Sequence, residues 1–286
     1  CTSAMTGVVS VTANPLPVAW TVMGGGTLCA GTSGVSITLS GSDMNVSYAL
    51  YNGTTATGTT LSGTGAILNF GLLTIPGEYS VQATDMLTGC TNNMNSTATV
   101  SVNPAPVQYA VTGGGNYCPG GAGVVVGLSG SQSGITYQLY RNGVATGATV
   151  SGTGGVVSFV AQTLGGNYTA IATDDVTGCN NTMTGAVTVG LHAAPVVHTV
   201  TGGGSYCAGG TGVSIALNGS SSGITYRLYN GATPVGSAIA GTGAAINFGM
   251  QSAAGTYSVL ATNPTTGCTL PMNSSATVVV NALPAV

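Results

Sequence analysis

The chain has 286 residues, of which only 2% are charged: two arginines, no lysine and five acidic residues. A protein that binds nucleic acid displaces counterions with a basic surface, and this sequence cannot build one, so nucleic acid is excluded as a partner. It also contains no apolar run of about 20 residues, the length that a membrane-spanning helix needs.

Cysteines and prolines recur along the chain with a constant step of 89 residues, which indicates tandem repeats of equal length. One cysteine series is Cys29, Cys118 and Cys207, another is Cys1, Cys90, Cys179 and Cys268, and the prolines are Pro17, Pro106, Pro195 and Pro284. We therefore predict repeats over residues 18–106, 107–195 and 196–286, the last including the start of a further linker. Residues 1–17 match the end of a repeat and are predicted to be the C-terminal strand of a preceding one.

Apolar and small polar residues alternate with a period of two inside each repeat, which is typical of β-strands. In the last repeat the alternating segments centre on Val196–Thr201, Val213–Leu217, Ile224–Leu228, Ile246–Phe248, Tyr257–Ala261 and Ala276–Val280. Six or seven short strands separated by turn residues, with no helical stripe, predict an all-β fold. The expected architecture is tandem immunoglobulin-like β-sandwich domains arranged end to end, with stiff proline joints.

Aromatic residues and glycines recur at fixed places in this pattern. One phenylalanine per repeat is expected in the core, and one tyrosine opens the penultimate strand, where immunoglobulin-like domains place a tyrosine corner. The triple glycines, such as Gly202–Gly204, are expected to form a tight bend between the first and second strands. The phenylalanines are Phe70, Phe159 and Phe248, and the tyrosines are Tyr79, Tyr168 and Tyr257.

Three short motifs recur in every repeat and resemble those of a known family. In the last repeat they are Cys207–Gly210, Gly255–Thr262 and Thr266–Cys268. The sequence is similar to the Ig-like and PKD-like tandem repeats of giant surface proteins of Bacteroidetes, of which the SprB-type gliding adhesins are an example. That resemblance implies secretion, surface filaments and adhesion. The family commonly has tryptophan in the third strand, where this chain has leucine, and its single tryptophan, Trp20, lies in a first strand.

Three disulfide schemes compete for the two cysteine series. Pairs 28 residues apart, such as Cys90 with Cys118, would join strands that run head to tail, which places them far apart. Pairs 61 apart, such as Cys29 with Cys90, have the spacing of an immunoglobulin bridge but fall at opposite ends of a sandwich. A disulfide needs Cα atoms within about 7 Å. We favour the third scheme, Cys29 with Cys179 and Cys118 with Cys268, and keep the 61-residue scheme open. Cys1, Cys90 and Cys207 would then pair with repeats outside this sequence.

Motifs for catalysis, cofactors and metals are absent, so we expect no enzyme, cofactor or resident metal. His192 and His198 flank one joint and are expected to be surface linker residues. A calcium site at Asp174 and Asp175 is a weak alternative, because the other repeats do not keep the acidic pair.

A second tyrosine in the third strand falls on the face opposite the core: Tyr51, Tyr140 and Tyr229. These side chains are expected either to pack on neighbouring loops or to make surface contacts with polysaccharide or with other filaments. The whole sequence favours the structural repeat region of an extracellular, cell-surface filament or stalk with an adhesive role. Its partners are then further repeats of the same chain. Two alternatives are a non-catalytic polysaccharide-binding arm of a secreted enzyme and a pilin-like subunit that exchanges a strand.

Overall fold

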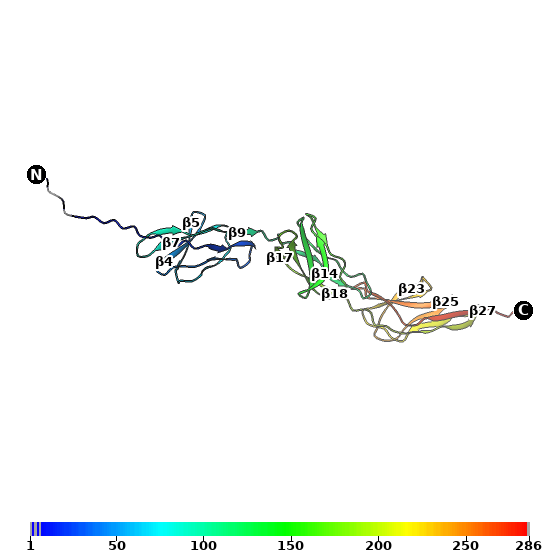
Figure 1. Ribbon diagram of the computed structural model, residues 1–286. Coiled ribbons are helices and arrows are strands. Elements are labelled where there is room, and N and C mark those ends of the chain that lie inside the picture. The colour runs from blue at the N-terminus through cyan, green and yellow to red at the C-terminus, as the bar shows by residue number, and fades with distance from the viewer. Residues whose placement is uncertain (1, 3–4, 6, 285–286) are drawn as a thin grey trace. The chain divides into compact units, whose positions relative to one another are not determined.

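A computed structural model describes residues 2, 5 and 7–284 of the chain. Every regular element among these residues is a β-strand, as the arrows of Figure 1 show. None of the described residues forms a helix long and apolar enough to cross a membrane. The all-β fold class expected from the period-two alternation is confirmed.

The first repeat forms two sheets that face each other across one core. A three-stranded sheet has the order β1-β3-β6, and a larger sheet has the order β2-β9-β7-β4-β5, with β8 paired to β7. The strands are β1 (Val22–Gly24), β2 (Gly26–Cys29), β3 (Val35–Leu39), β4 (Val46–Asn52), β5 (Thr55–Ser62), β6 (Leu68–Leu73), β7 (Gly77–Asp85), β8 (Thr91–Asn93) and β9 (Ala98–Asn103).

The second and third repeats have the same pair of sheets, in the orders β10-β12-β15 with β11-β18-β16-β13-β14, and β19-β21-β24 with β20-β27-β25-β22-β23. In the second repeat the strands are β10 (Val111–Gly113), β11 (Gly115–Tyr117), β12 (Val126–Leu128), β13 (Ile135–Arg141), β14 (Val144–Ser151), β15 (Val157–Ser158), β16 (Gly166–Asp174), β17 (Asn180–Thr182) and β18 (Val187–Leu191). In the third they are β19 (Val200–Gly202), β20 (Gly204–Cys207), β21 (Val213–Leu217), β22 (Thr225–Asn230), β23 (Thr233–Ala240), β24 (Ile246–Gln251), β25 (Gly255–Thr262), β26 (Thr269–Pro271) and β27 (Ala276–Asn281).

Alternating side chains from both sheets fill the core of each repeat. Tyr48 on β4 is fully buried, as are its counterparts in the other repeats, Tyr137 and Tyr226. Each fully buried large apolar side chain contributes about 1.5–3 kcal/mol relative to exposure. The tyrosine corner is also present, because the Tyr257 hydroxyl donates to the Ala253 carbonyl at 2.8 Å. Tyr79 and Tyr168 make the same bond to the residue four positions upstream.

The triple glycines lie between the first and second strands of each repeat, where a bend is expected. At this bend the edge of the sandwich passes from the smaller sheet to the larger one. All three glycines of Gly202–Gly204 have positive φ, and a Cβ on Gly203 would lie 2.6 Å from the Thr277 carbonyl oxygen. After the switch, β20 pairs in parallel with β27, and Cys207 lies opposite Asn281 at the end of that ladder.

Contacts group the described chain into two compact units. One contains Cys1–Gln108 together with Gln132–Tyr137 and Ile171–Thr182, and the other contains Tyr109–Ser131, Gln138–Ala170 and Met183–Val286.

The strand predicted within residues 1–17 partly lies outside the described residues, and those described before Thr21 form no strand. A strand needs a hydrogen-bonded neighbour. Its counterpart β9 is bonded to β2 and β7, and the matching neighbours for residues 1–17 are not in this sequence, so the assignment stays a prediction.

Candidate functional site: the disulfide joints

The cysteine near the start of each repeat is placed by the strand that has switched sheets. In the first repeat β2 runs parallel to β9, with Cys29 opposite Asn103. The Ala30 N–H donates to the Asn103 carbonyl at 2.8 Å, and the Thr32 hydroxyl donates to the Cys29 carbonyl at 2.7 Å. Cys29 is therefore held at the end of the sandwich where the chain leaves for the next repeat.

The cysteine near the end of each repeat is placed by the tight turn that follows β7, β16 or β25. In the second repeat the Asp174 carboxylate accepts the N–H groups of Val176 at 3.0 Å and Thr177 at 2.8 Å. The Asp174 N–H donates to the Cys179 carbonyl at 2.8 Å, and the Cys179 N–H donates to the Thr177 hydroxyl at 3.3 Å. These bonds fix Cys179 at the end of the sandwich where the chain enters.

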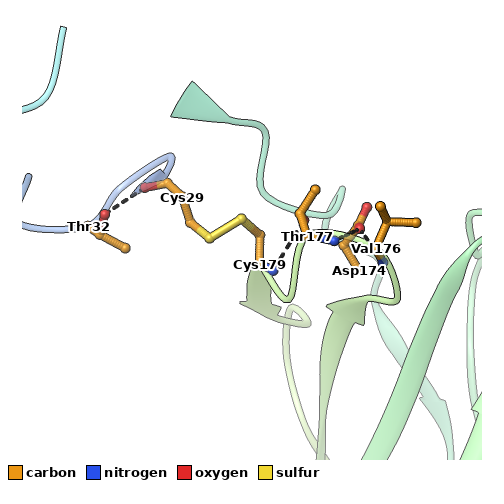
Figure 2. The surroundings of a disulfide bond; sticks show 6 residues. All are labelled: Cys29, Thr32, Asp174, Val176, Thr177 and Cys179. Atoms are coloured by element: carbon orange, nitrogen blue, oxygen red, sulfur yellow. Dashed lines mark hydrogen bonds between the residues drawn. A yellow bond between two sulfur atoms is a disulfide. The ribbon is translucent and has the colours of Figure 1, made fainter. Parts of the chain in front are cut away.

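Two disulfides join these positions between consecutive repeats. Cys29 bonds to Cys179, and Cys118 bonds to Cys268, each with a sequence separation of 150 and a Cα–Cα distance of 5.4 Å. Figure 2 shows the first of them, with the turn of Asp174 on one side and Thr32 on the other. Cys179 and Cys268 are fully buried. In both cases the bond joins the exit end of one repeat to the entry end of the next.

Electrostatics stabilise the turn that carries Cys179. The N–H groups of Thr177 and Val176 donate to the Asp174 carboxylate and hold the pKa of that carboxyl below its ordinary value. Asp85 has a lowered pKa in the corresponding turn of the first repeat, for the same reason. The third repeat has Asn263 at this place, and its side-chain oxygen accepts the same two N–H groups.

The proline joint beside the first disulfide is anchored by hydrogen bonds that the sequence pattern did not reveal. Pro106 is buried, and its carbonyl accepts the side-chain amide of Asn181 at 2.8 Å. The Val107 N–H donates to the side chain of Gln132 at 2.6 Å, and the Gln108 amide donates to the Thr182 carbonyl at 2.9 Å. The start of the second repeat is thus a hydrogen-bonded segment, and the stiffness expected of the proline joints stays a prediction.

Two cysteines are unpaired among the residues that the structure describes. Cys90 lies half-buried in a turn like that of Cys179, and its carbonyl accepts the Asp85 N–H at 2.9 Å. Cys207 is exposed at the end of β20, in the place that Cys29 and Cys118 occupy in their repeats. Cys1 lies outside the described residues. Cys90 and Cys207 thus present the two complementary halves of the joint, with no partner among the described residues.

The second tyrosines of β4, β13 and β22 lie on the outer face of the larger sheets. Tyr51, Tyr140 and Tyr229 are all partly exposed, whereas the tyrosines three residues earlier are buried. The alternation therefore follows the expected register. What these side chains contact outside the chain stays a prediction.

The expectation for His198 is corrected. It is a partly buried residue of the sandwich and not a surface linker residue, because it occupies the position of Trp20 and Tyr109 in the other repeats. Its ring lies over Gly219, where a Cβ would come within 2.8 Å, and against Tyr226 with ring centroids 6.1 Å apart. The step of 89 residues is the signal that would have found this place.

The remaining candidate residues do not belong to a cluster of metal-binding side chains among the described residues. His192 is partly buried at the second proline joint, and its N–H donates to the Tyr117 carbonyl at 2.9 Å. One carboxylate of the acidic pair, that of Asp174, is occupied by its own turn. Within the described residues, no group of three or more histidine, cysteine or acidic side chains is placed to hold a metal ion.

A comparison with protein families matches residues 17–104 to the model described as "Ig-like domain CHU_C associated". This segment coincides with the first repeat, whose pattern the other two repeats share. No curated protein shows significant similarity to the chain.

Solved structures similar to the chain are multi-domain proteins of low sequence identity. The human OSCAR ligand-binding domain is 14% identical, with 61% of this chain and 100% of that chain covered and a TM-score of 0.27. The mouse nectin-like molecule 4 ectodomain (Ig1–Ig3) is 15% identical, with 91% and 98% covered and a TM-score of 0.35. The chicken CNTN1 FN1–FN3 domains are 10% identical, with 92% and 96% covered and a TM-score of 0.33. These scores are too low to carry an argument, and the sheets and the family match decide the fold: the chain is a tandem array of Ig-like β-sandwich domains.

Proposed function

We propose that the chain is a stalk segment of a secreted cell-surface protein, in which disulfides staple each repeat to the next. The observation that carries this proposal is the pair of bonds Cys29–Cys179 and Cys118–Cys268, each between consecutive repeats. Disulfides persist in oxidising environments outside the cell. Because the sequence contains no lysine, a lysine isopeptide cross-link is closed to it, and the disulfide is the covalent bond available for reinforcing a joint.

The staples change what a pulling force does to the array. Without them, a force applied to the ends passes through every residue in turn and unfolds one repeat after another. With them, the force crosses from Cys29 to Cys179 and from Cys118 to Cys268, which leaves most of the first and third repeats outside the shortest covalent path. A tether that adheres under flow gains from this, because it holds its length under load.

The low charge content suits the same role. With 2% charged residues, contacts along the array depend little on salt, and trypsin-like proteases have two arginines to attack. The resemblance to surface adhesin repeats supports an adhesive role, which is part of this proposal.

The strand-exchange alternative is less well supported. In each repeat the larger sheet is completed by a strand of the same repeat, as β9 is by its bonds to β2 and β7. A donated strand therefore has no gap to fill inside the described sheets and could add only at an edge such as β5 or β6. The polysaccharide-binding alternative has one specific observation in its favour, which concerns the first repeat alone and is argued below.

Small-angle scattering on the oxidised chain tests the stalk. An extended array should give a rod-like profile, with each sandwich adding about 40 Å from strands of about 3.3 Å per residue and a joint. The same preparation carrying Cys29→Ser and Cys118→Ser is the matched control and should scatter as a more flexible string. A compact globule for the oxidised chain would contradict the proposal.

A further inference from the structure

The outer face of the first repeat carries a groove of about 620 Å³. We propose that this groove binds a neutral polysaccharide chain. The residues on which the argument depends are Tyr51, Ser80, Gln82, Asn93, Ser96 and Thr97. The proposal goes beyond the stalk and does not depend on it, because a rigid and a flexible array would present the same groove.

The groove exists because β7 changes its neighbour halfway along. Gln82 of β7 lies opposite Asn93 of β8, whereas Tyr79 of β7 lies opposite Ala98 of β9. The connection between β8 and β9 crosses this gap, with the buried Met94 at its base and Ser96 at a φ of 63°. The sheet is therefore hollowed between β4, β7 and this connection.

The lining has the chemistry that recognises a sugar. The partly exposed Tyr51 lies directly opposite Ser80 across the β4–β7 ladder and offers an aromatic ring on which a pyranose can stack. Beside them the Gln82 amide donates to the Asn93 amide oxygen at 3.2 Å, which leaves further donors and acceptors of both amides free for vicinal hydroxyls. An aromatic body with a few placed polar groups is the usual composition of a small-ligand site.

Charge selects a neutral chain over an acidic one. None of the groove's lining residues is charged. The carboxylate of Glu78 lies beside the groove, where it accepts the hydroxyl of the lining residue Thr97 at 2.6 Å. A uronate or sulfate in the groove would meet this negative charge with no basic residue to offset it, since both arginines lie in other repeats.

An extended peptide fits the groove less well. Peptides that add to a sheet bond to an unpaired strand edge. Here the neighbouring strand β7 is bonded on one side to β4 and on the other to β8 and β9. The floor of the groove thus offers side chains and not a free row of backbone groups.

The other two repeats keep the tyrosine and lose the pair of amides formed by Gln82 and Asn93. Gln82 is replaced by Ile171 in the second repeat and by Leu260 in the third, which lies opposite Pro271 where the first repeat has Asn93. The fold accepts these apolar residues at the same register. The first repeat therefore differs from its neighbours at the side chains that a sugar would contact, and the chain itself provides matched substitutions.

Affinity electrophoresis of the whole oxidised chain tests the proposal. The probes are gels containing neutral polysaccharides (xyloglucan, galactomannan, laminarin or dextran) or the acidic polygalacturonate. The variants are Tyr51→Ala and Gln82→Leu, the second of which copies the third repeat and so should fold. Tyr229→Ala removes the equivalent tyrosine of the third repeat and is the control.

We expect at least one neutral polysaccharide to retard the chain, and both first-repeat variants to weaken that binding at least tenfold. Tyr229→Ala should bind as the unmodified chain does. Three results would each overturn the proposal: no retardation by any neutral polysaccharide, retardation by polygalacturonate alone, or equal loss in Tyr229→Ala. Circular dichroism of each variant distinguishes lost binding from lost folding, and if Tyr51→Ala is misfolded, Gln82→Leu alone decides.

Discussion

The disulfide staples make a quantitative prediction about how far the chain can be pulled. The perturbation is reduction of both bonds, or their removal one at a time by Cys29→Ser and Cys118→Ser. The assay is single-molecule stretching in optical tweezers, with handles attached to the two termini through peptide tags, so that no cysteine is used for coupling.

The expected lengths follow from the connectivity. An extended chain spans about 3.5 Å per residue, so the reduced and unfolded protein of 286 residues reaches about 1,000 Å. In the oxidised protein the shortest path runs to Cys29, across to Cys179, back to Cys118, across to Cys268 and out to the end. That path has about 107 residue steps and two disulfides, and reaches about 390 Å. Removing either bond leaves about 135 steps, or about 480 Å.

The unpaired cysteines provide the controls. Cys90→Ser and Cys207→Ser should leave the oxidised length unchanged, because neither residue lies in a bond of this chain. If cysteines 61 residues apart were paired instead, Cys207→Ser would release the loop to Cys268 and add about 210 Å. An increase of that size, or equal lengths for the oxidised and reduced proteins, would refute the connectivity.

Three further predictions concern single residues. Because the pKa of Asp174 is lowered in the folded protein, its ionised carboxylate stabilises the fold above the unfolded pKa of about 3.9, and this contribution is lost as the pH falls through the folded pKa. Asp174→Asn, which copies Asn263, should therefore make the thermal midpoint less sensitive to acid. Equal acid sensitivity of the two proteins would contradict this role. Tyr257→Phe removes the corner hydrogen bond and should cost about 1 kcal/mol in urea unfolding; an unchanged midpoint would show that the bond contributes nothing. Gly203→Ala forces a side chain onto a φ of +78° and toward the Thr277 carbonyl and should cost about 1–3 kcal/mol or more; a stability equal to the parent would disprove the strain.

Much of the fold could be predicted because the same sequence pattern occurs in all three repeats. Alternation identified the strands with a buried face, and the tyrosine corner was recognisable from Tyr257 near the start of its strand. The strand β23 was missed because both of its faces are largely exposed and carry no apolar alternation. The bend at the glycine triplet could be predicted, but the change of sheet at that bend could not, because both need the same positive φ values.

The disulfide joints could be predicted from the sequence, whereas the groove could not. The pairing of Cys29 with Cys179 was favoured from strand direction alone, because the end of the sandwich that each cysteine occupies follows from the topology. The groove beside Tyr51 could not be foreseen, because it depends on where β7 changes partners and on which side chains then meet across strands. In the sequence the groove is marked only by Gln82, where the other repeats have isoleucine or leucine. This difference can be interpreted only when the pairing register of the strands is known.

The staple between consecutive repeats is tested most directly by mapping the disulfides of the native protein. Non-reducing digestion with pepsin at low pH prevents thiol exchange and does not depend on the two arginines of the chain. We expect a cross-linked peptide that holds both Cys118 and Cys268. A cross-linked peptide that holds Cys118 and Cys179 would place the bond within one repeat and contradict the account.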